Sequence, residues 1–224
     1  HDLYVDTSML ERKIADSQFV VTISDYNRTL LEQNNLQHKP IHLLRAGIDT
    51  SAYRFRPRGV PVEGQVRALT VASLQGYKGH AVLLHALAMG GPSVDRITVD
   101  FIGDGPLREE LEQLVAQLGL SRRVRFLGGR SEAEVRAALD DADLFVLPSV
   151  IADDGQMEGL PVVLMEPLAC GVPTISTALS GIPEIVVDFR RRQRQRQTFR
   201  LVVVFSALPE TWPRDARRAM APSD

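Results

Sequence analysis

The chain has 224 residues, 44% of them hydrophobic and 24% charged, a composition typical of a globular protein with a sizeable core. Its formal net charge of −2 provides no overall attraction to nucleic acid or to an anionic membrane. The single cysteine, Cys170, excludes a disulfide within the chain, and its apolar neighbours favour a buried side chain over a nucleophile. No run approaches the roughly 18 apolar residues of a membrane span. The chain starts at His1 rather than Met, so we expect a fragment of a longer protein.

The first 64 residues predict a short α/β series followed by a linker. Residues 9–15 have a helical pattern, and residues 19–23 form an apolar run that predicts a buried strand. Ser24 is placed to cap a helix that reaches about residue 36, and a short strand is expected at 41–44. Residues 55–64 are rich in Pro, Arg and Gly, which is typical of a linker between domains.

A second and more regular series of strands and helices follows the linker. This alternation predicts a Rossmann-like parallel sheet flanked by helices, in which ligands bind at the carboxyl ends of the strands. Each glycine-rich turn of the series lies at such an end. The expected strands are 68–73, 97–102, 124–127, 144–147 and 174–176, and the expected helices are 80–89, 107–118 and 132–139, the last capped by Ser131.

The character of the sequence changes after about residue 187. Residues 188–224 hold nine arginines against four acidic residues, and residues 190–197 are of low complexity. A strand is conceivable at 201–205, but nothing around it continues the alternation of strands and helices. We therefore expect a divergent, disordered tail and hypothesise that it arises from a frameshift or a misassembled gene.

Two glutamates, Glu158 and Glu166, bracket an apolar run that opens with Gly-Leu-Pro. If the run is helical from about Gly159, the two carboxylates lie about 12 Å apart, since each residue rises 1.5 Å. The amide groups at the helix start would favour an anion between them. This span suits a sugar nucleotide, whose hydroxyls lie at both ends and whose diphosphate lies in the middle. Glutamates near helix starts are also common for purely structural reasons, and this segment alone leaves both interpretations open.

Taken together, the motifs resemble those of the retaining glycosyltransferase family 4, also called glycosyl transferases group 1, which has the two-domain GT-B fold. The resemblance is closest to bacterial enzymes that build exopolysaccharide and other surface glycans. A glycine-rich turn alone occurs in many folds, but here the motifs stand in family order over residues 1–187. They are Asp25-Tyr-Asn-Arg28, Gly47-Ile-Asp49, Lys78-Gly79, Phe101-Ile-Gly-Asp-Gly-Pro106, Val124-Arg-Phe-Leu-Gly128, Ala142-Asp-Leu-Phe-Val-Leu-Pro-Ser149, Glu158-Gly-Leu-Pro161 with Glu166, and Ser180-Gly-Ile-Pro-Glu184.

The resemblance implies roles for particular residues. Glu166 would bond the ribose hydroxyls, Glu158 would contact the donor sugar near the reacting carbon, and Lys78 would stabilise the diphosphate leaving group. The catalytic candidates are thus Glu158 and Lys78. The other donor-binding candidates are Glu166, Gly159, Leu160, Pro161, Gly103, Gly105, Gly128, Arg130 and Ser73.

The sequence also departs from the family pattern. Members usually carry a Gly-Arg pair before the lysine, whereas Ala72 and Ser73 stand there in this chain, so one charge on the diphosphate is missing or supplied elsewhere. From the resemblance we expect most of the acceptor-binding domain to be absent. We expect residues 1–57 to be a remnant of that domain, residues 58–187 to be the donor-binding domain, and residues 188–224 to be the divergent tail.

We therefore expect a hexosyltransferase fragment that binds a nucleotide sugar, most simply a UDP- or GDP-linked one, and transfers little sugar by itself. The natural acceptor would be a glycan or a lipid-linked sugar. The alternatives are a non-catalytic nucleotide-sugar-binding module, a sugar-nucleotide epimerase on the same fold, and a Rossmann dehydrogenase. The last is disfavoured because the turn at Gly103 lacks the full G-x-G-x-x-G spacing.

We expect neither a cofactor nor a metal site, because the histidines show no metal-ligand spacing with Cys or acidic residues. Nucleic acid is not an expected partner, since no aromatic residues interleave with the basic tail. The expected location is the cytoplasm, with at most peripheral contact to the membrane face.

Overall fold

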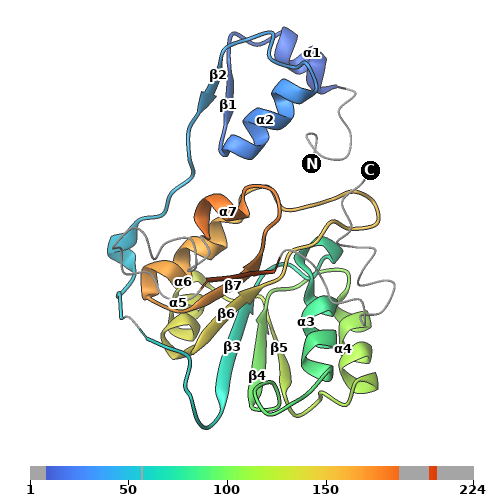
Figure 1. Ribbon diagram of the computed structural model, residues 1–224, viewed down its shortest axis with the longest axis vertical. Coiled ribbons are helices and arrows are strands. Elements are labelled where there is room, and N and C mark those ends of the chain that lie inside the picture. Colours follow the sequence, from blue (N-terminus) through green and yellow to red (C-terminus); the bar gives the residue numbers. More distant parts are fainter. Residues whose placement is uncertain (1–8, 57, 187–201, 206–224) are drawn as a thin grey trace.

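The computed structural model describes residues 9–56, 58–186 and 202–205 (Figure 1). In these ranges the strands form two sheets, one of two strands and one of six, and every pair of neighbouring strands is parallel. Helices pack on both faces of the larger sheet. The predicted α/β class with a parallel, Rossmann-like sheet is confirmed.

The small sheet pairs β1 (Val20–Thr22) with β2 (Ile41–Leu43). Helices α1 (Leu10–Ala15) and α2 (Asp25–Gln33) cover one of its faces. As predicted, the Ser24 hydroxyl caps α2 by accepting the Asn27 N–H at 3.1 Å. The core of this unit consists of Ile14, Leu31 and Leu36, with Val20 and Ile41 packed against it.

The prediction of a buried strand at residues 19–23 is wrong. Phe19 and Val21 are about half exposed, at 53% and 49%, and Ile23 is 37% exposed. Side chains alternate between the two faces of a strand, and α1 and α2 cover only the face that carries Val20 and Thr22. The strand is thus buried on one side only.

The larger sheet has the strand order β5-β4-β3-β6-β7-β8. From β3 the chain adds β4 and β5 on one side, then crosses back to place β6, β7 and β8 on the other side. Strands β3 and β6 therefore flank the point where the order reverses, and this is where such sheets bind ligands. The strands are β3 (Val66–Val71), β4 (Ile97–Ile102), β5 (Val124–Gly128), β6 (Leu144–Leu147), β7 (Thr174–Thr177) and β8 (Val202–Phe205).

Two layers of helices cover the larger sheet. Helices α3 (His80–Ala88) and α4 (Arg108–Gln117) pack on one face, and α5 (Glu132–Asp141), α6 (Met165–Cys170) and α7 (Ile182–Ile185) contribute to the other. Consecutive residues of β6 serve the two layers in turn: Leu144 and Val146 face the first, and Phe145 and Leu147 face the second. Each such side chain stabilises the fold by about 1.5–3 kcal/mol through burial.

The predicted linker at residues 55–64 has neither helix nor strand in its described part, but it is tied to the larger unit. The Arg56 N–H donates to the Cys170 carbonyl at 3.0 Å. The Arg58 guanidinium donates to the carbonyls of Asp140 and Ala142 at 2.7 and 2.9 Å, just where α5 ends. The described linker residues are therefore anchored, and the domain boundaries proposed above stay predictions. Cys170 is buried, as predicted.

The Arg-rich tail lies outside the described residues except for β8. This strand lies parallel to β7, from Val202 beside Thr174 to Phe205 beside Thr177. The strand that the sequence allowed at 201–205 is confirmed at these four residues, since a Val-rich segment has the propensity to add a parallel strand. The prediction that nothing around it continues the alternation concerns residues outside the described ranges. The frameshift hypothesis itself stays a prediction.

Candidate functional site

The point where the strand order reverses brings together two predicted site residues that are 80 positions apart in sequence. Lys78 ends the short 3-10 helix η2 (Gly76–Lys78), which follows β3, and Glu158 lies in the loop that follows β6. The Lys78 ammonium forms an ion pair with the Glu158 carboxylate, and each side chain is only 13% exposed. The Tyr77 ring lies 4.9 Å from the same ammonium. The structure therefore places both catalytic candidates at one point.

A glycine holds the Lys78 turn against the loop after β6. Gly79 has a left-handed backbone (φ +73°), and a Cβ atom there would overlap the Pro148 carbonyl oxygen. Beside it, the Val150 N–H donates to the Tyr77 carbonyl at 2.9 Å. A side chain at position 79 would push the two loops apart and strain the backbone. The position of Lys78 relative to the β6 loop thus depends on this glycine.

The predicted helix from about Gly159 is wrong. The backbone is extended at Pro161, continues as the 3-10 helix η3 (Val162–Leu164), and becomes α-helical only in α6. The residue before a proline is biased away from helical angles, so Leu160 is the natural break. The estimate of about 12 Å between the two carboxylates assumed a continuous helical rise and no longer applies. Leu160 and Pro161 are both buried.

Glu166 lies in the first turn of α6 and is partly buried. Burial raises the pKa of its carboxyl group, whereas the nearby Tyr53 hydroxyl partly opposes that rise. Burial and the charge of Glu166 in turn raise the pKa of the Tyr53 phenol. Tyr53 follows the short 3-10 helix η1 (Thr50–Ala52) and packs against the core under α6. Tyr53 was not among the predicted site residues, although its place just after the Gly47-Ile-Asp49 motif was an available signal.

The glycine-rich turn after β4 packs against the loop after β3. A Cβ atom on Gly103 (φ +139°) would overlap the Ala72 carbonyl oxygen, and one on Gly105 would lie 2.6 Å from the Leu74 carbonyl oxygen. The Leu74 N–H also donates to the Asp104 carbonyl at 3.0 Å. The two glycines are thus required for the contact between the loops after β3 and β4. Their close approach to a ligand stays a prediction.

The remaining candidates lie at the same edge of the sheet. Ser73 follows β3, two residues beyond the end of the strand, so the expected strand end at 73 was too late. Gly128 ends β5, and its carbonyl accepts the Gly103 N–H at 2.9 Å. Arg130 follows with a side chain that is 40% exposed and lies 3.9 Å from Glu134. Their contacts with a donor stay predictions.

His80 directly follows the Lys78 turn and is buried, with 2% of its surface exposed. Its ring meets Phe101 edge-on, with a centroid distance of 5.0 Å. Burial, aided by the Lys78 charge, lowers the His80 pKa to about 4. The ring is therefore neutral near pH 7 and suits an apolar support for the Lys78 turn.

The described part of the chain shows neither a cluster of metal-binding side chains nor a helix that could cross a membrane. Among those residues, no group of three or more His, Cys, Asp or Glu side chains is arranged to hold a metal ion. In the same ranges, no helix combines the length and the apolar character that a membrane crossing requires.

The chain matches a known protein family and is similar to several named proteins. The family described as "Glycosyl transferases group 1" matches residues 54–193. The chain is 36% identical over 167 residues to WcaL of Escherichia coli K12, named as a colanic acid biosynthesis glycosyltransferase, covering 75% of this chain and 41% of WcaL. It is 33% identical over 175 residues to the amylovoran biosynthesis glycosyltransferase AmsK of Erwinia amylovora, covering 78% and 43% of the two chains.

A solved structure of Anabaena HepE in complex with UDP matches with a TM-score of 0.63 and 25% identity, covering 76% of this chain and 47% of HepE. The chain spans about two fifths of the length of the curated relatives WcaL and AmsK.

Proposed function

Because the chain belongs to the glycosyl transferases group 1 family, we propose that residues 58–187 bind the nucleotide-sugar donor of a retaining, family 4 glycosyltransferase. The observation that carries the proposal is the Lys78–Glu158 pair at the carboxyl ends of β3 and β6. A cation and a carboxylate there match the two ends of a sugar diphosphate, one anionic and one rich in hydroxyl groups. HepE, a structural neighbour, was solved with UDP, which makes a UDP-linked donor the first candidate and a GDP-linked donor the second.

In this proposal the bound donor separates Lys78 from Glu158 and becomes the new partner of each. The Lys78 ammonium turns from Glu158 to the diphosphate, and the freed Glu158 carboxylate accepts hydrogen bonds from the sugar hydroxyls. Glu166 accepts hydrogen bonds from the ribose. As the bond between the sugar carbon and the diphosphate oxygen breaks, negative charge grows on the leaving group beside Lys78. The acceptor hydroxyl bonds to the same carbon, and its proton passes to the departing diphosphate oxygen.

The low exposure of the pair favours this role. Two charges held at 13% exposure interact more strongly than on the surface, and a ligand that offers both partners at once avoids leaving either charge buried alone. Gly79 keeps the Lys78 turn against the β6 loop, so the two groups are oriented before the donor arrives.

The biological setting that we propose is surface polysaccharide synthesis in a bacterium, since WcaL and AmsK are named for colanic acid and amylovoran. The acceptor would be a glycan or a lipid-linked sugar, met in the cytoplasm or at the membrane face. Residues 1–57 would contribute only a small part of the acceptor side, so the chain should transfer sugar far more slowly than a full-length relative.

The test is a binding panel on the 224-residue chain with UDP, GDP, ADP and NAD, followed by calorimetry with the ligand that raises Tm. Glu166→Gln should weaken the binding of that nucleoside diphosphate about tenfold to a hundredfold, because hydrogen bonds to a charged group contribute about 1.5–3 kcal/mol. Lys78→Ala should weaken it comparably. Glu109→Gln, at an exposed position of α4, is the matched control and should change nothing.

The proposal fails if no nucleoside diphosphate binds a cooperatively folded chain, or if Glu166→Gln and Glu109→Gln bind equally well. Release of free or epimerised sugar from the donor without an acceptor would instead favour the epimerase alternative.

A further inference from the structure

Glu184 connects the larger unit to the small one. Its carboxylate accepts the N–H groups of Asp25 and Tyr26, at 3.0 and 2.9 Å, in the first turn of α2. It also forms an ion pair with Arg45, which in turn pairs with Asp25 at 2.5 Å. These contacts join positions up to 159 residues apart in sequence. The first turn of α2 is thus capped from within by Ser24 and from outside by Glu184.

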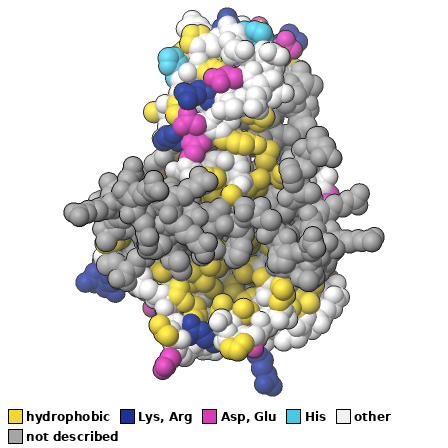
Figure 2. All heavy atoms as spheres, viewed as in Figure 1, with side chains coloured by type: hydrophobic (Ala, Val, Ile, Leu, Met, Phe, Trp, Pro, Cys, Tyr) yellow, Lys and Arg dark blue, Asp and Glu magenta, His cyan; other side chains and the backbone are white. Residues whose placement is uncertain are grey.

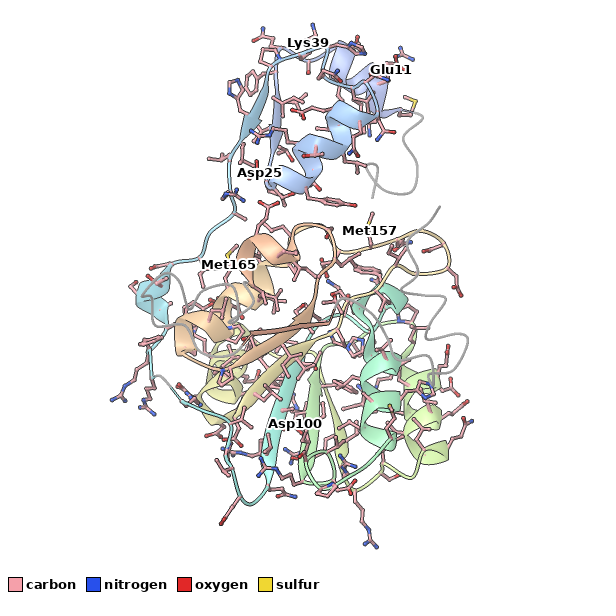
Figure 3. All side chains as sticks on the ribbon, in the orientation of Figure 1. Glu11, Asp25, Lys39, Asp100, Met157 and Met165 are labelled. Carbon is pink, nitrogen blue, oxygen red and sulfur yellow. The ribbon has the colours of Figure 1, made fainter. Side chains whose placement is uncertain are left out.

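The charges of this cluster support one another. Burial alone would raise the pKa of Glu184, but the Arg45 guanidinium and the two backbone donors outweigh burial and lower it. Figure 2 shows acidic and basic side chains side by side where the small unit meets the larger one. In Figure 3, Asp25 lies at the end of α2 that faces the larger unit, away from Glu11 and Lys39.

The same short segment that carries Glu184 also holds the backbone of Glu158. The Ser180 hydroxyl donates to the carbonyl oxygens of Glu158 and Gly159, the latter at 2.9 Å. The Gly181 N–H donates to the Gly159 carbonyl at 3.0 Å. Ser180 adopts a left-handed backbone (φ +47°), which costs a residue other than glycine about 1–2 kcal/mol. The hydroxyl has a single proton, which the two carbonyl oxygens share, and this donation offsets part of that cost.

Gly181 lies between the two contacts and leaves no space for a side chain. A Cβ atom there would lie 2.8 Å from the Gly159 carbonyl oxygen and 3.2 Å from the Ser24 Cβ atom. Residues 180–184, which we name the coupling segment, therefore touch the Glu158 loop on one side and the start of α2 on the other. A shift of α2 would move the segment that supports Glu158.

We propose that Ser180 and Glu184 are positioning residues for donor-sugar recognition. Ser180 holds the Glu158 backbone in place, and the Asp25–Arg45–Glu184 cluster holds the coupling segment against the acceptor-side unit. The proposal rests on the proposed function, in which Glu158 contacts the sugar. Glu166 lies on α6, outside the coupling segment, so the segment should affect recognition of the sugar more than that of the nucleotide.

The test compares dissociation constants on the full chain for UDP and UDP-glucose, and for GDP and GDP-mannose. Ser180→Gly removes the hydroxyl while permitting the left-handed backbone, and should weaken the sugar nucleotide about threefold to tenfold and the free nucleotide less than twofold. Glu184→Gln should act in the same direction with a smaller effect. Added salt screens the Glu184–Arg45 ion pair, so in the parent chain it should reproduce part of the selective loss of sugar-nucleotide binding. In Glu184→Gln, which lacks this ion pair, salt should cause no such selective loss. Glu109→Gln is again the control.

Equal losses for the sugar nucleotide and the free nucleotide would overturn the proposal, as would no loss in either variant. Amide hydrogen exchange adds a readout that needs no ligand. The Gly181 amide, which donates to the Gly159 carbonyl, should exchange about tenfold faster in Ser180→Gly than in the parent chain, with β4 unchanged. If the parent chain binds no nucleotide, the proposed function fails, and this exchange result still decides whether residues 180–184 support Glu158.

Discussion

The two sheets of this chain are built from similar sequences but are buried differently. Residues 19–23 and 144–147 are both short apolar runs. Val21 of β1 and Phe19, just before this strand, are about half exposed, while every residue of β6 is buried. The larger sheet has helices on both faces, and the small sheet has α1 and α2 on one face only. An apolar run therefore indicates a strand, but not how many of its faces are covered.

The largest expected difference between the two sheets is in the unfolding free energy that is lost when a phenylalanine in or next to each is replaced by alanine. Phe101 is fully buried in β4, so Phe101→Ala should cost about 3–5 kcal/mol of unfolding free energy. Phe19 is 53% exposed, and its main described aromatic contact is an edge-on approach to His42, so Phe19→Ala should cost about 1 kcal/mol or less. Urea unfolding followed by circular dichroism measures both. Similar losses would mean that the outer face of β1 is covered in solution.

An intermediate effect concerns His80 and pH. Its pKa is about 4 in the folded chain against about 6.5 unfolded, so the unfolded state binds more protons between these values. The stability due to the neutral ring is complete above pH 6.5 and is lost as pH falls toward 4. From pH 7.5 to 4.5 the loss should be about 2–3 kcal/mol, and His80→Leu should remove that part of the pH dependence. His42→Leu, at an exposed position, is the control. An unchanged slope in His80→Leu would contradict the assignment.

The smallest expected effect concerns the open face of the small sheet. Val21→Thr keeps a β-branched side chain and should change the unfolding free energy by about 0.5 kcal/mol or less, as for most surface substitutions. The same substitution at the buried Val146 of β6 should cost more, because its hydroxyl would enter the core without a partner. Equal effects at the two positions would remove the distinction between the sheets.

Much of the fold could be predicted because its signals are local. Strands β4 and β6 begin and end at the predicted residues. Ser24 caps α2 and Ser131 caps α5, as predicted. The capping box of Ser131 with Glu134 involves only three residues of separation, so it is visible in the sequence. The helix from Gly159 failed because the pattern of apolar residues was weighed above the proline at 161, which disfavours helical angles at Leu160. The α-helix itself begins only at Met165, after the 3-10 helix η3.

The sequence by itself determined the order of strands and helices, the placement of glycine turns at strand ends, and the residues that carry the family pattern. These depend on periodicity, capping and backbone preferences within a few residues. Only the tertiary structure decided that Lys78 meets Glu158, that Glu184 caps α2, and that Tyr53 approaches Glu166. Such contacts depend on the strand order and on how the units pack. The residues next to a side chain in sequence do not determine which distant residue it contacts in the folded chain.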